Sequence, residues 1–333
     1  MYNKSVHHST QRIEISYKTI VFTVGFLLSL WLLWTMMELI FGLFLSFILM
    51  SALKPLVNRM ESKKVPRQLA AFLVLISAIG LIGFTLGFIL PPIISESILF
   101  FKNLPFLLAK TFPFLQDYLK VESAIQFLPD LTQNVVKVVT GVFSNFLFLV
   151  SVFFFTFYFL LEEKFLEKFL SRFFEPRQTR KIVEVTEKIE RRMGAWMRGE
   201  IVLMSVIGIL TYVGLSILGV KYALSLAFIA GLLEVIPIIG PIISAIPAVL
   251  VATSTSYVLS GGTIILYIII QQLENNIVVP FVLSKAVGMN PITTLIALTV
   301  GGTLGGLMGS ILAVPAALFI ETIVSETMKE KSS

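Results

Sequence analysis

Long apolar runs separated by short polar stretches dominate this chain, and they predict a bundle of membrane-spanning helices. Residues 19–53 form one apolar run, which is too long for a single crossing because about 20 residues span the hydrocarbon core. A tight turn at residues 36–38 would divide this run into a helical hairpin. The apolar runs at 68–90, 138–161 and 201–219 each have the length of one span.

The polar stretches between these runs predict which side of the membrane each loop faces. The stretch 54–67 carries five basic residues and one acidic residue, and such loops stay in the cytoplasm by the positive-inside rule. The N-terminal tail 1–18 has no small-residue cleavage site before the first apolar run, so we expect that run to be a retained helix with a cytoplasmic N-terminus.

Two amphipathic segments predict small layers outside the membrane core. Residues 92–137 are cut by prolines and follow a helix that should end at Pro91–Pro92, which predicts short extracytoplasmic helices. Residues 162–198 carry dense charge of both signs and a phenylalanine at every fourth position from 165 to 173. They predict an amphipathic helix at the inner interface and a second helix after Pro176, the alternative being a solvated cytoplasmic linker.

The last part of the membrane region, 199–325, contains helix breakers inside apolar sequence. Counting crossings from a cytoplasmic N-terminus places residues 222–258 and 291–324 as two oppositely oriented broken hairpins around one helix at 262–279. The alternative is that each segment forms two complete, kinked spans, because proline and glycine are common in transmembrane helices. The polar tail 326–333 follows.

Composition supports an all-α polytopic membrane bundle and removes several functional classes. The chain is 56% hydrophobic and 14% charged, whereas a soluble domain carries about a quarter charged residues. It has no cysteine, which excludes disulfides and thiolate metal sites. Its net charge of +6 is concentrated in membrane-flanking loops, so it indicates contact with lipid headgroups and gives no reason to expect nucleic acid.

Glu234 is the first candidate functional residue, because it lies in apolar sequence just before helix breakers. The breakers that follow are Pro237, Gly240 and Pro241. A charged side chain at mid-bilayer costs at least about 2.5 kcal/mol, so it needs water or a partner. We interpret Glu234 as a proton- or cation-coupling carboxylate at a broken helix, where freed backbone carbonyls can also coordinate a cation. The alternative is a helix-capping carboxylate near an interface.

The segment 271–276, with sequence QQLENN, is the second candidate. It offers amide and carboxylate groups at four candidate positions, Gln271, Gln272, Glu274 and Asn275. Gln271 and Asn275 are four residues apart, so they should share a helix face. The segment could line a polar pathway, hold helices together by hydrogen bonds, or mark the end of a helix at the inner interface.

A set of closely spaced glycines marks the final apolar segment. Their spacing gives small-xxx-small pairs, which favour close helix packing; the tip of a broken hairpin is the functional alternative. The set consists of Gly301, Gly302, Gly305, Gly306 and Gly309.

Enzyme motifs are absent from the sequence. The chain contains neither H-E-x-x-H nor a phosphate-binding G-x-x-x-x-G-K-[ST] pattern, and its histidines lie at 7 and 8 while its aspartates lie at 117 and 130. We therefore expect no catalytic residue, no cofactor and no permanent metal site, although a sodium ion could bind transiently at Glu234 or Glu274.

Several stretches taken together resemble the autoinducer-2 exporter family of bacterial permease-like membrane proteins. The most specific are GLLEVIPIIGPIISAIPA at 231–248, QQLENNIVVPFVLSKAVGMNPITTLIAL at 271–298 and GGTLGGLMGSILAVPAAL at 301–318. The resemblance implies transport without ATP hydrolysis in the bacterial inner membrane. It also implies functional positions at the acidic residue before the I-P-x-x-G-P turn, Glu234, and in the glutamine-rich element that ends near Pro280.

Three functions are compatible with these observations. The first is a secondary transporter that exports a small polar solute such as autoinducer-2. The second is a monovalent cation/proton antiporter with Na⁺ or Li⁺ as the cation, in which Glu234 and Glu274 exchange protons. The third is a membrane scaffold without transport activity. The glycine-rich faces and the outer layer also predict a homo-oligomer.

Overall fold

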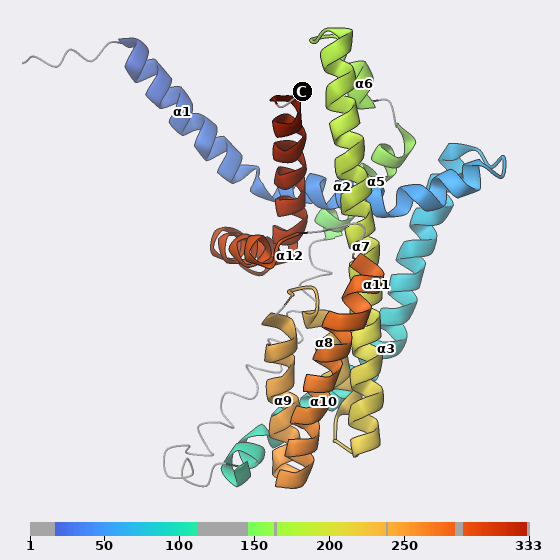
Figure 1. The fold of residues 1–333 in the computed structure, drawn as a ribbon, viewed down its shortest axis with the longest axis vertical. Helices are drawn as coiled ribbons and strands as arrows, with labels where there is room; N and C mark the ends of the chain where they lie inside the picture. The colour runs from blue at the N-terminus through green and yellow to red at the C-terminus, as the bar shows by residue number, and fades with distance from the viewer. Residues whose placement is uncertain (1–16, 112–145, 163–164, 238, 284–288, 332–333) are drawn as a thin grey trace, which may run out of the picture. The chain divides into compact units, whose positions relative to one another are not determined.

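The described part of the protein consists of helices joined by short turns. The computed structural model describes residues 17–111, 146–162, 165–237, 239–283 and 289–331 (Figure 1). No strand occurs within these ranges, and five helices there are long and apolar enough to cross a membrane. The predicted all-α polytopic membrane fold is confirmed. The chain forms two compact units, Met1–Phe44 and Leu45–Ser333, which are described separately below.

The first unit contains α1 (Tyr17–Thr35) and the start of α2 (Met37–Glu61). The apolar side chains of α1 are largely exposed, as for Trp31 at 64%, which suits a helix that faces lipid. Backbone hydrogen bonds continue across the break at Met36, because the Met36 amide donates to Leu32 and the Ile40 amide donates to Met36, both at 2.9 Å. The tight turn predicted at 36–38 is therefore wrong: the helical path bends there without reversing.

Helix α3 (Arg67–Thr111) is longer than the sequence predicted. We expected it to end at Pro91–Pro92, yet it continues through both prolines. Each proline removes one backbone hydrogen bond, a loss that membrane helices tolerate when other groups satisfy the freed carbonyls. Residues 92–111 of the predicted outer layer therefore belong to α3, and the rest of that layer, 112–137, lies outside the described residues.

The charged segment before residue 200 is helical and continuous with the span that follows. After α5 (Phe146–Leu161) and the short α6 (Phe165–Leu170), helix α7 runs without interruption over Pro176–Leu218. Pro176 begins it, where a missing N–H costs nothing. The predicted helix after Pro176 is confirmed, but it and the span at 201–219 form a single helix. Residues 138–145, the start of the predicted fourth span, lie outside the described residues.

Beyond α7 the chain forms a tightly packed group of helices. Gly219 caps α7 in the left-handed region, with φ 73°, and the Val220 amide donates to the Leu215 carbonyl at 2.9 Å, as in a Schellman motif. Helix α8 (Ala223–Leu233) then packs against α7 and against α9 (Ile239–Thr255), as Figure 1 shows. Two half-length helices thus occupy 222–258; that they re-enter the membrane from one side stays a prediction.

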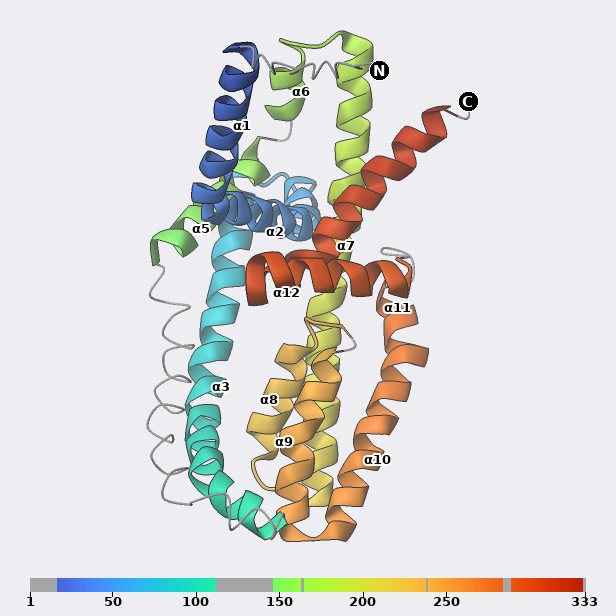
Figure 2. The ribbon, with the colours of Figure 1, turned by 90° about the vertical axis from the view of Figure 1, so that its left-hand side faces the viewer.

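The last helices carry two irregularities. Helix α10 (Tyr257–Leu273) passes into a single π-helical turn, Glu274–Val278, and then into α11 (Val279–Leu283). Helix α12 (Pro291–Lys331) changes direction at Gly306, whose φ and ψ are 57° and −138° (Figure 2). The tail predicted from residue 326 is therefore helical as far as Lys331.

Polar contacts join the charged half of α7 to the end of α12. The Arg192 guanidinium donates to Thr322 Oγ1 at 2.8 Å and to Glu321 Oε1 at 3.1 Å. One turn earlier on α7, Lys188 forms an ion pair with Glu326. The charged half of α7 is thus held against α12, which the linker alternative does not predict.

The α12 kink requires three of the five glycines. A Cβ on Gly301 would lie 2.4 Å from the Gly309 carbonyl oxygen, and one on Gly309 would lie 2.0 Å from the Gly301 carbonyl oxygen. The two halves of α12 therefore touch through bare backbone. Gly306 supplies the positive φ that the change of direction needs. These contacts agree with close packing; that the break is the tip of a re-entrant hairpin stays a prediction.

We expect Gly301→Ala to destabilise the protein by about 1–3 kcal/mol, because the added methyl overlaps backbone that cannot move aside. Thermal unfolding in detergent measures the effect. Gly83→Ala on α3 is the matched control, since nothing lies within 4 Å of the place its Cβ would occupy. There the change should be neutral or stabilising by up to about 1 kcal/mol, because alanine favours helix. Equal melting temperatures for the two variants would contradict the close contact at the kink.

Candidate functional site

Glu234 lies at the break between α8 and α9. Its backbone amide donates to the Ala230 carbonyl at 3.2 Å, so the residue closes the last turn of α8. Pro237 follows where the chain leaves α8, and Gly240 then lets the first turn of α9 come close to the end of α8. A Cβ on Gly240 would lie only 1.9 Å from the Leu233 carbonyl oxygen. The breakers recognised in the sequence thus hold the end of one helix against the start of the next.

A second close approach brings Glu200 to the same region. Gly231 on α8 packs against α7, where a Cβ would lie 2.8 Å from the Met204 carbonyl oxygen and 3.1 Å from the Gly208 Cα. Helices α7 and α8 are antiparallel neighbours, because only a short turn connects them. Glu200 lies about one turn before Met204 on α7, and Glu234 lies about one turn after Gly231 on α8. Because the two helices are antiparallel, both glutamates lie on the same side of this contact.

Glu274 completes the group from α10. It is the first residue of the π-helical turn, a feature that occurs mostly at functional sites. Its side chain lies beside Gln271 and Glu234. Two carboxylates so close repel each other when both are charged, so bringing them together favours binding of a proton or a cation.

We call Glu200, Glu234 and Glu274 the carboxylate cluster. The three residues are 2%, 1% and 6% exposed, and each has one carboxyl oxygen that is buried without a hydrogen-bond partner: Glu200 Oε1, Glu234 Oε2 and Glu274 Oε2. The charge of Glu200 acts on Glu234, and that of Glu274 acts on both other residues. Within the described ranges no ion pair involves any of them. Three buried acids with no cation beside them form a site with strong affinity for positive charge.

The structure divides the residues predicted in the QQLENN segment into two groups. Gln271 is half-buried and lies beside Glu274, whereas Gln272 and Asn275 are exposed. Gln272 accepts hydrogen bonds from Asn276 Nδ2 at its carbonyl oxygen, 2.8 Å, and at Oε1, 3.0 Å. That Gln271 and Asn275 share a helix face stays a prediction.

Glu200 is the member that the sequence did not reveal. It is the last charge of a dense charged stretch and directly precedes an apolar run, so it did not stand out as a charge inside apolar sequence. The useful signal was the absence of proline between Pro176 and residue 218, which favours one helix through both segments. Pro237 and Pro241, in contrast, are half-buried next to the break, where the sequence placed them.

Among the described residues, no group of three or more His, Cys, Asp or Glu side chains has the arrangement of a metal site. Transient binding of sodium at Glu234 or Glu274 therefore stays a prediction.

The fold and this site define a class, that of multi-pass helical membrane proteins with buried carboxylates at broken helices. Comparison with known proteins makes the assignment specific. A family model described as AI-2E family transporter matches residues 20–329. The chain belongs to this family and is a membrane transporter.

Relatives of similar length support the assignment. The chain is 27% identical to "Putative transport protein YueF" of Bacillus subtilis, with 88% of this chain and 87% of the relative covered. It is 25% identical to "Putative transport protein YrrI" of the same organism, with the same coverage. It is also 25% identical to "Putative permease PerM" of Escherichia coli K12, where 80% of this chain and 81% of the relative are covered.

Proposed function

We propose that this protein is a secondary transporter of the bacterial cytoplasmic membrane that exchanges a monovalent cation for protons at the carboxylate cluster. The observation that carries the proposal is the burial of three mutually interacting carboxyl groups without a compensating cation. Such a site binds either protons or a cation, because leaving all three groups charged and empty is costly. Competition between the two at one site is the basis of exchange.

The position of the cluster also supports this function. Glu234 and Glu274 lie where helices are interrupted, at the α8–α9 break and at the π turn. Interrupted helices in transporters expose carbonyl groups that coordinate cations. Gln271 adds an amide beside Glu274, so the surroundings offer neutral oxygen ligands as well as charge.

Export of a small polar solute such as autoinducer-2 is the second candidate, favoured by the description of the family. In that case the cluster would supply the proton coupling, and an organic solute would take the place of the cation.

Proton movement in liposomes tests the proposal. Purified protein is reconstituted with a pH-sensitive dye inside, and sodium, lithium or potassium is added outside. We expect cation-dependent proton efflux that falls by about tenfold or more in Glu234→Gln and Glu274→Gln, because each change removes one of the carboxyl groups that bind the cation and the proton. A tenfold change corresponds to about 1.4 kcal/mol. Glu184→Gln, an exposed acid on α7, is the control and should behave as wild type.

A wild-type sample with verified orientation that moves no protons under any cation gradient would exclude exchange. Export of a small solute would then be the remaining function.

A further inference from the structure

A polar cavity lies between the second half of α2 and the charged half of α7, lined on α7 by residues that precede Glu200. Its volume is about 360 Å³, which is the size of a small-molecule site. Its charged and amide lining consists of Lys54, Asn58, Glu187, Glu190, Arg191 and Arg198. The carboxylate cluster contributes nothing to this lining, so the α2–α7 cavity is a separate feature.

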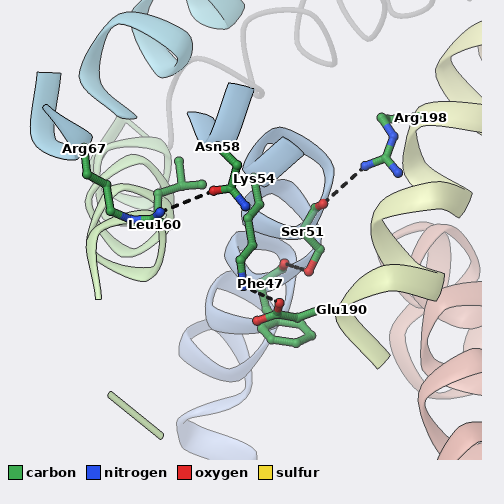
Figure 3. A network of polar contacts seen from close by, with 8 residues as sticks. All are labelled: Phe47, Ser51, Lys54, Asn58, Arg67, Leu160, Glu190 and Arg198. Carbon is green, nitrogen blue, oxygen red and sulfur yellow. Dashed lines mark hydrogen bonds and ion pairs between the residues drawn. The ribbon is translucent and has the colours of Figure 1, made fainter. Parts of the chain in front are cut away.

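Pro55 and Gly194 explain how the wall of this cavity is built. Pro55 lies inside α2 and has no N–H, so the Ser51 carbonyl four residues earlier lacks its helical partner. Gly194 lets α7 come close at this point, where a Cβ would lie 2.1 Å from the Ser51 carbonyl oxygen. Arg198 Nη1 then donates to the Ser51 carbonyl at 3.3 Å (Figure 3). It also donates to the Ala52 carbonyl at 3.1 Å.

These bonds fix the Arg198 guanidinium in place. Both use Nη1, so the donors on Nη2 and Nε are left for a ligand. A planar guanidinium held in this way is pre-organised to bind an anion through two parallel hydrogen bonds.

Two further contacts orient donors around the same space. Lys54 Nζ pairs with Glu190 Oε2 at 2.7 Å. Asn58 Oδ1 accepts from Arg67 Nη1 at 3.3 Å (Figure 3), which turns the Asn58 amide so that its NH₂ group is the end available for other partners.

The charge balance of the cavity favours an anion. Lys54 and Glu190 neutralise each other, which leaves Arg191 and Arg198 against Glu187. Within the described residues no hydrogen bond or ion pair engages Arg191, although it lines the cavity two turns before Arg198 on the same helix face. The remaining donors, two guanidinium groups and one amide, come from two helices and surround a common volume.

We propose that the α2–α7 cavity binds a small phosphate-bearing anion, held by Arg191, Arg198 and Asn58. A phosphate group has acceptor oxygens pointing in several directions, which suits donors arriving from both helices better than the two coplanar oxygens of a carboxylate. Glu187 also lines this cavity, and its negative charge limits how much negative charge a bound anion can carry. The phosphate can belong to a soluble compound or to the headgroup of an anionic lipid.

Binding by the full-length protein in lipid nanodiscs tests this proposal. In discs of phosphatidylcholine, glycerol 3-phosphate and inorganic phosphate are titrated and their Kd values are measured by calorimetry. We expect Arg191→Gln to weaken binding at least about tenfold, the effect of losing one charge-assisted contact. Glu187→Gln should tighten binding several-fold by removing a like charge, an effect that damage to the fold does not produce.

Two more variants complete the comparison. Asn58→Asp keeps an oxygen for Arg67 but replaces the NH₂ donor by a negative charge, so binding should weaken at least as much as in Arg191→Gln. Arg180→Gln removes the same charge as Arg191→Gln, from an exposed position on α7, and should leave the Kd within about twofold of wild type.

Discs that contain phosphatidylglycerol distinguish the two sources of phosphate. If a lipid headgroup fills the cavity, phosphatidylglycerol should raise the melting temperature of the wild type and of Arg180→Gln, but not that of Arg191→Gln, and it should compete with glycerol 3-phosphate. If only the soluble phosphates bind, the ligand is soluble. The proposal is overturned if Arg191→Gln and Arg180→Gln show the same Kd for the soluble phosphates and the same change in melting temperature with phosphatidylglycerol. Because the readout is binding, this result is independent of cation exchange.

Discussion

Replacing Glu200 by glutamine should reduce cation-driven proton flux by about tenfold or more and, at the same time, make the protein more stable. Glu200 is 2% exposed and its Oε1 has no hydrogen-bond partner. Removing its charge reduces the repulsion acting on Glu234 and Glu274 and removes the cost of burying a charge without a partner, so the free energy of unfolding should rise. The same change lowers the affinity of the site for cations, because attraction from the third carboxylate is lost.

The opposite signs of the two effects make this prediction specific. The dye assay in liposomes measures flux, and thermal unfolding in detergent measures stability. A variant that loses both indicates that Glu200 has a structural role, whereas one that keeps full flux removes Glu200 from the coupling site. Glu184→Gln on the exposed side of α7 is the control, and we expect it to change neither quantity.

Replacing Gly240 by alanine should disrupt the break between α8 and α9. The added Cβ would lie 1.9 Å from the Leu233 carbonyl oxygen and 2.5 Å from its carbonyl carbon, distances that side chains do not adopt. The start of α9 must therefore move away from the end of α8. We expect a loss of about 3 kcal/mol or more, at the upper end of the effect of overpacking, and a large loss of flux because Glu234 lies next to the displaced backbone.

The control for this change is Gly261→Ala in α10, where nothing lies within 4 Å of the added Cβ. It should be neutral or slightly stabilising in the same detergent melt. Wild-type flux and stability in Gly240→Ala would contradict the close contact between α8 and α9 on which the site geometry depends.

The sequence predicted the parts of this site whose chemistry conflicts with their surroundings. Glu234 stood out because a carboxylate in apolar sequence next to helix breakers is costly. Glu274 stood out because amide and carboxyl groups follow a long apolar helix. Their proximity could not be deduced, since it depends on how α8 and α10 pack against α7.

The other predictions failed where a local signal was weaker than helix continuity. Pro91–Pro92 was interpreted as a helix end, but α3 passes through it. Glu200 adjoins the charged segment 162–198, and α7 carries that segment without a break into the apolar run. Glu274 begins a π turn, which regular helical spacing does not predict. Sequence periodicity assumes regular helices, so it cannot locate such irregular turns.

The unbroken course of α7 fixes the distance between two regions with different tasks. Arg192, which bonds to α12, and Glu200 lie eight residues apart on this helix, a separation of about 12 Å at 1.5 Å per residue. Deleting one residue between them would turn the Glu200 side chain by about 100° relative to Arg192. Either the contact with α12 or the place of Glu200 among the carboxylates would then be lost. The length of this stretch is therefore as much a part of the site as the identity of its acidic residue, and only changes of whole helical turns preserve the orientation of both.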